Sequence, residues 1–266
     1  MKLLFYVLFG VGILASCEKL PPVNLPPVLP VVTPTDSTKL KLIAYYPFDN
    51  TAADFSGHQF NGVVNDITSV QDRFGRSNAA YFFNGKSSYI TINDDSLLRL
   101  SNTDFTINYW VNIKTISNSY GEITLSKRGT NQNDGWITGV SGQLAASATS
   151  VGRAGSVTFN VSGGIDPHAY GLRVIPLNEW HMVTVIYDLL LSSLNIYIDG
   201  VLDSSTLNMP SPNRYSNTPL VLGADSQGQF NPSFADYLYN GSLDELRIYN
   251  RKLSLSEITK FHNSVK

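Results

Sequence analysis

Short runs in which apolar and polar residues alternate dominate the sequence from Leu40 onward, and they restrict the fold more than any other feature. The clearest run covers residues 105–113, where every second side chain is apolar: Phe105, Ile107, Tyr109, Val111 and Ile113. A period of two is typical of a β-strand with one buried face. Turn residues separate the runs, and one pair, Asp199-Gly200, suits a tight hairpin. The sequence therefore predicts an all-β domain.

One segment near the end of the chain has the pattern of a helix instead. Ser254 is followed three residues later by Glu257, which is the spacing of a capping box, and the apolar residues from 255 to 261 fall on one helical face. No shift in composition divides residues 40–266. We therefore expect a single β-sandwich domain over residues 40–266 that carries a short C-terminal helix.

The first 16 residues have the features of a secretory signal that is removed from the mature protein. Lys2 precedes an unbroken apolar run over residues 3–14, which is shorter than the ~20 residues of a spanning helix. The segment Leu14-Ala15-Ser16-Cys17 resembles the bacterial lipobox, so we expect Cys17 to begin the mature chain and to carry fatty-acyl chains such as palmitate. The alternative is an ordinary signal peptide with an incidental cysteine. Since Cys17 is the only cysteine, the mature domain can contain no internal disulfide.

A proline-rich segment follows the cysteine. Six of the 13 prolines lie between Leu20 and Thr35, and proline fixes φ and lacks an amide donor, which favours polyproline II. We interpret residues 17–39 as a linker that, at ~3.1 Å per residue, could hold the domain roughly 60 Å from a bilayer. These features predict a lipid-anchored protein of the bacterial cell envelope. The outer membrane is favoured, although Glu18-Lys19 alone does not decide between the two membranes.

The charge balance argues against nucleic acid as a partner. Lys and Arg number 19 against 21 Asp and Glu, and the formal net charge is -2, whereas nucleic-acid binding usually needs a markedly basic face. Only 15% of the residues are charged, well below the ~25% of an average globular domain. This composition is typical of an all-β domain outside the cytoplasm.

Several short motifs, taken in order, resemble those of the laminin-G-like, or concanavalin A-like, jelly-roll family. In the first half they are Tyr45-Tyr46-Pro47-Phe48-Asp49, Asp54-Phe55-Ser56-Gly57, Phe82-Phe83-Asn84-Gly85 and Asp104-Phe105-Thr106-Ile107. In the second half they are Trp180-His181, Ile196-Tyr197-Ile198-Asp199-Gly200 and Gly241-Ser242-Leu243-Asp244-Glu245-Leu246-Arg247-Ile248-Tyr249-Asn250-Arg251. The resemblance implies a two-sheet antiparallel jelly-roll sandwich. Members of this family mostly bind glycans or proteins, and some of their relatives cleave polysaccharides.

The sequence lacks the residue pattern that cleavage of a polysaccharide needs. A glycosidase uses two carboxyl groups beside the bond that breaks, and the related glucanases carry them in Glu-x-Asp-x-x-Glu, which does not occur here. The four histidines lack the close spacing of a zinc site. Asp199 and Asp203 are interpreted as turn residues. We therefore expect no enzymatic activity, while the fold alone leaves the function open.

The resemblance also implies a structural calcium ion, which this family often binds where the first strand ends near a later turn. Calcium takes about six to eight oxygen ligands, many of them backbone carbonyls, so a sequence shows only part of such a site. The residues that match the family's site are Asp49, Asp54, Gly85 beside Asn84, and Asp244. The alternative is that the first two aspartates cap turns and that Asp244 pairs with Arg247 or Arg251.

Three segments place aromatic rings beside amide or carboxylate groups, which is the combination that binds sugars. The first choice is Trp136 with Asn133 and Asp134, and the other two segments centre on Tyr170 and Tyr237. The alternative for each ring is packing beneath its own loop, since tryptophan in particular is usually well buried.

An adhesion or assembly module that engages another protein through a flat sheet face fits the anchor, the linker and the low charge as well. A polar groove with exposed rings would favour sugar, whereas a large apolar patch would favour protein. The sequence thus predicts a non-catalytic, membrane-anchored binding module for a glycan or a surface protein, with the glycan favoured.

Overall fold

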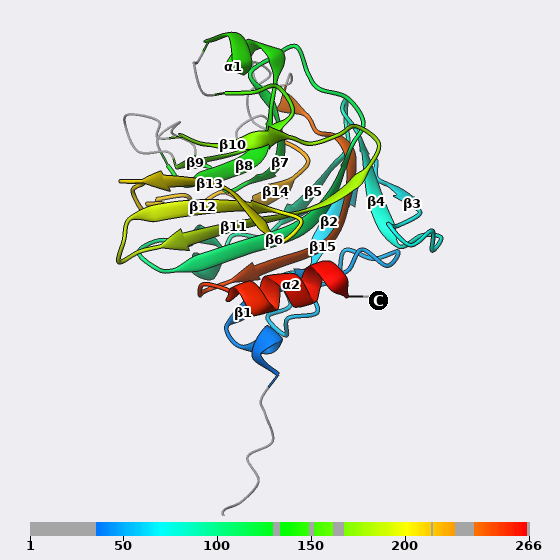
Figure 1. Ribbon diagram of the computed structural model, residues 1–266. Coiled ribbons are helices and arrows are strands. Elements are labelled where there is room, and N and C mark those ends of the chain that lie inside the picture. The colour runs from blue at the N-terminus through cyan, green and yellow to red at the C-terminus, as the bar shows by residue number, and fades with distance from the viewer. Residues whose placement is uncertain are drawn as a thin grey trace, which may run out of the picture. The chain divides into compact units, whose positions relative to one another are not determined.

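Two β-sheets packed face to face make up the domain in a computed structural model, which describes residues 36–129, 134–148, 152–161, 168–213, 215–226 and 237–264. Figure 1 shows the two layers, with a helix beneath one of them. The predicted all-β sandwich of two antiparallel sheets is confirmed. The compact unit begins at Asp36, slightly before the predicted boundary at Leu40.

Within the described residues, eight strands form the first sheet, and their pairings are antiparallel. Seven of them follow one another across the sheet as β13 (Val201–Leu207), β12 (Ser193–Ile198), β11 (Trp180–Asp188), β6 (Phe105–Ile113), β15 (Asn240–Tyr249), β4 (Ala80–Asn84) and β3 (Thr68–Val70). The eighth, β1 (Leu42–Tyr46), pairs with the C-terminal half of β15, and β4 pairs with its N-terminal half. The last strand of the chain therefore lies in the middle of the sheet.

The second sheet contains seven strands of the described part of the chain. In spatial order they are β10 (His168–Val174), β9 (Ser156–Val161), β8 (Trp136–Ser141), β7 (Gly121–Ser126), β14 (Leu220–Leu222), β5 (Tyr89–Ile92) and β2 (Gly62–Asn65). The helical segments are η1 (Ser37–Lys39), η2 (Ser96–Arg99), α1 (Gln143–Ala148) and α2 (Leu255–Asn263). Among the described residues, none of these helices has the length and apolar character needed to cross a bilayer.

Helix α1 is the one helix of six or more residues that the sequence did not predict in the described ranges. It has only six residues, and its one large apolar side chain, Leu144, is exposed. Its first amides donate to carbonyl oxygens of a distant loop, Gln143 to Ser117 and Leu144 to Ser119. These contacts from outside the helix explain why its local sequence does not reveal it.

The alternation in β6 sends its side chains to opposite faces of the first sheet. Phe105 points between the two sheets, where its ring stacks on Tyr187 of β11 at a centroid distance of 5.2 Å and lies 5.7 Å from Phe159 of β9. All five predicted inner residues of this strand are buried. Apolar area removed from water contributes about 25 cal/mol per Å², so the space between the sheets is the main source of stability.

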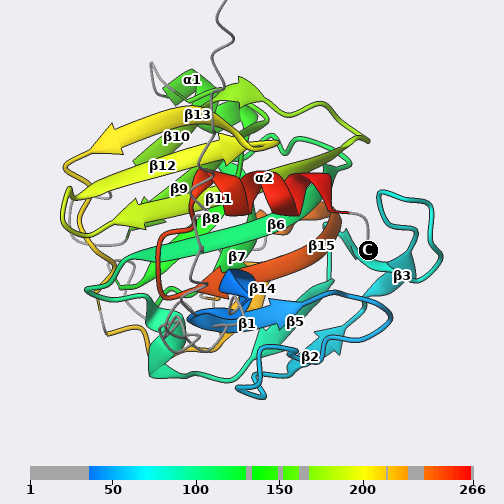
Figure 2. The same cartoon turned by 60° about the horizontal axis from the view of Figure 1, so that its bottom comes forward.

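The outer face of the first sheet is covered by α2, which Figure 2 shows lying across β11, β6 and β15. Ile258 and Phe261 of the helix pack against the sheet in a second buried cluster that includes Trp110 and Tyr249. The predicted capping box is present at Ser254. The C-terminal helix predicted from the sequence is therefore confirmed.

The first turn of α2 also holds the beginning of the domain in place. Arg251 donates to both carboxylate oxygens of Glu257, at 2.8 and 3.0 Å, and to the carbonyl oxygens of Ser37 (2.6 Å) and Leu40 (2.8 Å). One guanidinium thus joins the N-terminal segment, the last strand and the C-terminal helix.

A carboxylate links the edge strands of the two sheets. Asp203 on β13 accepts hydrogen bonds from the backbone amides of Leu172 (2.8 Å) and Arg173 (3.0 Å) on β10. Its interpretation as a turn residue is wrong, because Asp203 lies inside a strand. Asp199 does lie in the turn between β12 and β13, where its φ is 53°.

Acid should weaken the contact between α2 and the start of the domain. The hydrogen bonds from the Arg251 guanidinium and, to a smaller extent, from the Ser254 amide lower the pKa of Glu257 from 4.5 to about 2. A carboxyl whose pKa is lowered by folding stabilises the protein above its unfolded value, and this contribution is lost as the pH falls from about 4.5 to about 2.

We expect Glu257→Gln to lower the free energy of unfolding by about 1–2 kcal/mol at pH 7, after allowance for solvent screening, and by much less at pH 2.5. Denaturant titration at both pH values measures the difference. Glu179→Gln, an exposed carboxyl, is the control, and equal losses for Glu257→Gln at the two pH values would contradict this role of Glu257.

Candidate functional site

The outer face of the second sheet carries two rows of side chains over β7 to β10. The first row, set by cross-strand register, holds Tyr170, Thr158, Gly139 and Ile123. The second row holds His168, Asn160, Ile137 and Ser126. The residues between them along each strand, such as Phe159 and Ala169, point into the core. Strand alternation therefore places rings, an amide, two isoleucines and short side chains on this face, and several of these, including Ser126 and Ile123, are buried.

A cavity of about 530 Å³ lies over these rows. Besides residues of the two rows, its lining includes Tyr120, Glu122, Arg128, Ser141, Ala145, Asp225 and Tyr237. A second cavity of about 690 Å³ adjoins it and is lined by Gly85, Thr115, Ser117, Asn118, Ser119, Tyr120, Glu122, Leu144, Tyr237, Leu238 and Asn240. The two share Tyr120, Glu122 and Tyr237, so they form one continuous depression, which we call the groove.

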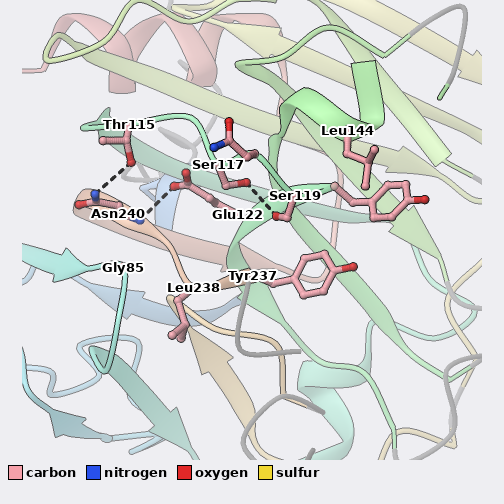
Figure 3. Close-up of a pocket in the computed structure, with 11 residues that line it drawn as sticks. Gly85, Thr115, Ser117, Ser119, Glu122, Leu144, Tyr237, Leu238 and Asn240 are labelled. Atoms are coloured by element: carbon pink, nitrogen blue, oxygen red, sulfur yellow. Dashed lines mark hydrogen bonds between the residues drawn. The ribbon is translucent and has the colours of Figure 1, made fainter. Parts of the chain in front are cut away.

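The groove contains several aromatic rings that solvent can reach. Tyr170 is partly exposed and stacks on His168, with ring centroids 5.4 Å apart and an interplanar angle of 15°. Tyr237 and Tyr120 line the part that both cavities share. Figure 3 shows the Tyr237 ring across from Leu144 and the Glu122 carboxyl beside Asn240. Rings in such positions can stack on the apolar face of a ligand.

The floor of the groove is kept open by a glycine. A Cβ atom at Gly139 would lie 2.1 Å from the carbonyl oxygen of Glu122 on the neighbouring strand, which is too close for any other residue. The sheet therefore presents bare backbone between Ile123 and Thr158. Nearby, the Ser141 hydroxyl is buried and makes no hydrogen bond within the described residues. Such a hydroxyl can serve a ligand.

An ion pair fixes one wall of the groove. Arg128 Nη1 lies 3.0 Å from Asp225 Oδ2, and the other oxygen of Asp225 accepts from the Ser126 hydroxyl at 3.1 Å. The Ser226 hydroxyl bonds Ser126 at 2.9 Å and accepts from the Arg128 amide at 3.0 Å. This network ties β7 to the segment after β14 and holds Arg128 at the edge of the groove.

Glu122 is a buried carboxyl where the two cavities meet. Its Oε2 accepts from the Asn240 amide at 3.0 Å, and the Ser117 amide also bonds it. Burial outweighs both bonds and raises the pKa of Glu122 from 4.5 to about 7. The carboxyl therefore changes charge near neutral pH at the junction of the two cavities.

Two of the predicted ligand residues, Tyr170 and Tyr237, line this groove together. The first choice, Trp136, does not: it is 0% exposed, stacks on Phe159 and donates its Nε1 hydrogen to the Leu98 carbonyl at 3.1 Å. The prediction of an exposed Trp136 ring is wrong, because the residue starts β8 in the inward register. A buried ring cannot stack on a sugar.

The two polar residues predicted beside Trp136 have different outcomes. Asn133 lies outside the described residues. Asp134 precedes β8, where its Oδ1 accepts from Asn213 Nδ2 at 3.0 Å and its carbonyl oxygen accepts from the Gly129 amide. Asp134 thus supports a loop and does not line the groove.

The four residues predicted to bind calcium are not brought together as ligands. The Asp54 carboxylate accepts from the amides of Tyr45, Ser56 and Phe60, which is the turn role weighed as the alternative. Asp49 lies 3.7 Å from the Arg76 guanidinium. Gly85 takes a φ of 67° in a turn.

Asp244 is fully buried and pairs with Arg73 at 3.1 Å, while Arg247 pairs with Glu245 and Arg251 with Glu257. Arg73 lies 4.3 Å from the centroids of both Phe74 and Trp110. The guanidinium supplies the positive charge that calcium would bring. Across the described residues no three His, Cys, Asp or Glu side chains form a metal-binding group. Calcium stays a prediction that these contacts do not support.

Several residues of the groove were not found from the sequence: Tyr120, Glu122, Arg128, Ser141, Asn160 and Asp225. Asn160 and Ser141 lie at outward positions of strands whose register the sequence did not predict. Arg128 and Asp225 are 97 residues apart and meet only in the fold.

Residues 84–259 match the family described as the concanavalin A-like lectin/glucanases superfamily. The match spans more than half of the chain, and the chain belongs to this family. The jelly-roll fold predicted from the short motifs is thereby confirmed. The chain matches no protein whose function has been curated.

Solved structures share the fold at low sequence identity. Domain 4 of AbnA, an extracellular GH43 arabinanase from Geobacillus stearothermophilus solved with arabinotriose, is 24% identical with a TM-score of 0.62, over 84% of this chain and 98% of that one. The binding domain of Paraclostridial Mosquitocidal Protein 1 is 18% identical (TM-score 0.62), over 85% and 52%.

The binding domain of botulinum neurotoxin DC, in complex with rat synaptotagmin II, is 14% identical with a TM-score of 0.57, over 86% of this chain and 52% of that one. This chain therefore spans about half the length of either toxin domain. At these identities, the three similarities show the fold alone.

The raised pKa of Glu122 predicts a specific pH dependence of stability. Because folding raises this pKa above its ordinary value of 4.5, the carboxyl stabilises the folded state fully below pH 4.5, and that contribution disappears as the pH rises through about 7. Relative to Glu122→Gln, the free energy of unfolding should fall by about 2–3 kcal/mol between pH 5 and pH 8. Denaturant titrations across this range measure it, and parallel profiles for the two proteins would refute the assignment.

Proposed function

We propose that the domain binds a carbohydrate chain in the groove without cleaving it. The observation that carries the proposal is the presence of three tyrosine rings, Tyr120, Tyr170 and Tyr237, in one depression with amide, hydroxyl and charged side chains. Sugars stack their C–H faces on aromatic rings and use neighbouring polar groups for their hydroxyls. The similar arabinanase domain was solved with arabinotriose, which is in keeping with a sugar ligand.

The carboxyl groups of the groove support binding over cleavage. A glycosidase needs one carboxyl to protonate the leaving oxygen and another to attack or activate water. Of the described groove residues, Asp225 is tied to Arg128 and Ser126, and Glu122 is tied to two backbone amides. Both carboxyls therefore already have partners inside the protein.

Recognition of a surface protein is the second candidate function. The similar toxin domain was solved in complex with synaptotagmin II, and the same fold can present other faces to a protein. A protein that binds another face would leave affinity insensitive to changes at the rings of the groove, which separates this candidate from a sugar in the groove.

The carbohydrate proposal is tested on a glycan array that includes arabino-oligosaccharides, followed by calorimetry with the best ligand. Removing a stacking ring at the centre of a binding site costs about 2 kcal/mol or more. We therefore expect Tyr170→Ala to weaken binding by over tenfold while the melting temperature changes little. Tyr215→Ala, an exposed tyrosine outside the groove lining, is the matched control. Unchanged affinity for both Tyr170→Ala and Tyr237→Ala would move the ligand away from the groove.

We further propose that the chain is a lipoprotein of the bacterial cell envelope, acylated at Cys17 and favouring the outer membrane. The support lies in the sequence Leu14-Ala15-Ser16-Cys17 and in the proline-rich linker that follows. More than one acyl chain is needed for stable anchoring, at ~0.8 kcal/mol for each buried CH₂.

Mass spectrometry of the purified protein should find a mature chain that starts at Cys17 and carries the added mass of acyl chains. Cys17→Ser should abolish that mass. An unmodified cysteine, or a mature N-terminus elsewhere, would contradict the anchor and leave the glycan proposal untouched.

A further inference from the structure

Three consecutive leucines form the turn between β11 and β12. Leu190 is 90% exposed and Leu191 is 66% exposed, and Leu189 is partly covered. Leu207, at the end of β13, is 69% exposed and lies opposite Ser193 beside this turn. We call residues 189–191 together with Leu207 the leucine tip.

Large apolar side chains are unusual in a hairpin turn. Such turns favour Gly, Asn, Asp and Ser, and the next turn along the chain, between β12 and β13, is Asp199-Gly200. No residue from 189 to 193 carries a charge. Leu190 and Leu191 contribute little to the core. A group of exposed apolar side chains indicates a site of contact with a membrane or with another protein.

The leucine tip lies at the end of the first sheet where the chain enters the domain. Lys252, just before α2, bonds the carboxylate of Asp188 at the base of the tip. The preceding residue, Arg251, donates to the carbonyl oxygens of Ser37 and Leu40. Figure 2 shows the β11–β12 turn and the start of β1 toward the same side of the sheet.

A second set of hydrogen bonds leads from the tip to the same place. The Leu189 amide donates to Asp104 Oδ1 at 2.9 Å, and the neighbouring Thr103 hydroxyl bonds Asn250. The Asn250 amide in turn donates to the Lys41 carbonyl at 3.0 Å. Two short paths of hydrogen bonds therefore join the tip to the entry of the chain.

We propose that the leucine tip inserts into the surface of the bilayer that holds the lipid anchor. This inference rests on the proposed acylation of Cys17. A linker over residues 17–35 joins the domain at Asp36, so this edge is tethered within reach of the membrane and lies about 60 Å away only when the linker is fully extended. Because linkage raises the effective concentration of the second contact, a few apolar side chains suffice where they would not bind from free solution.

A bilayer fits this tip better than a protein partner does. A stable protein interface buries about 800 Å² on each side, which a single convex turn with four leucines does not offer. Apolar side chains at the tip with basic residues around them are the pattern of segments that lie in a lipid surface. The exposed basic residues Lys39 and Lys41 lie at the entry of the chain. At the base of the tip itself, Lys252 is paired with the Asp188 carboxylate, and the Asp104 carboxylate accepts from the Leu189 amide.

The test uses the acylated full chain reconstituted in vesicles of phosphatidylethanolamine and phosphatidylglycerol. Since lipid blocks the only native cysteine, Leu190→Cys provides a single thiol for an environment-sensitive fluorophore. Val63→Cys is the matched control, because Val63 is an apolar residue, 68% exposed, on the edge strand β2 of the other sheet. We expect lipids brominated in their acyl chains to dim the label at Leu190 at least about threefold and the label at Val63 hardly at all.

A second pair of variants checks that the leucines themselves make the contact. The label is placed at Leu207→Cys, in the native chain and in a chain with Leu190→Ser and Leu191→Ser. Exposed leucines can be replaced without unfolding the domain, which circular dichroism verifies. The double replacement should lower the ratio of docked to undocked domain at least about tenfold.

Each other outcome overturns the proposal in a recognisable way. Labels at Leu190 and Val63 that are dimmed equally overturn the contact of the tip. A shifted emission at Leu190 without quenching by brominated lipid indicates a protein partner or a second copy and overturns the bilayer as the occupant. A chain that does not float with the vesicles overturns the lipid anchor and, with it, this inference.

Discussion

The central position of β15 is the constraint on which the rest of the structure depends. This last strand pairs with β6 on one side and with β1 and β4 on the other, so three segments far apart in sequence are held by one. It also carries Asp244, the partner of Arg73, and leads directly into α2. Because these pairings are long-range, the two sheets can close around their common core only when the C-terminal strand is in place.

The fold was predictable from the sequence because its signals are local. The strand β6, the turn at Asp199-Gly200 and the capping box at Ser254 each depend on a few neighbouring residues, and all three are present, although α2 buries the second face of β6 as well. Helix α1 was not predictable, since it is held by carbonyl groups of a distant loop. The face on which Trp136 lies was missed as well, because a ring at a strand's first residue points inward or outward according to the register of the whole sheet.

Only part of the groove could be predicted, for a related reason. Tyr170 and Tyr237 were found because each lies beside polar residues in its own segment. The Arg128–Asp225 pair and the hydrogen bond between Glu122 and Asn240 join residues far apart in sequence, and no local pattern predicts them. Arg73 is the converse case: it comes from a loop that the sequence motifs do not include, and its charge meets Asp244 where the resemblance implied a metal.

The hydrogen bonds that the Leu172 and Arg173 amides donate to Asp203 affect how the domain behaves when many copies lie close together. An open edge strand has unpaired amides that can form hydrogen bonds with an extended segment of another molecule. Such pairing is a route by which β-proteins aggregate. Here a side chain from the opposite sheet already occupies two of those amides on β10, so a neighbour would have to displace a carboxylate before it could add a strand. A high local concentration of the protein therefore favours separate, correctly folded domains over fibrils that grow from this edge.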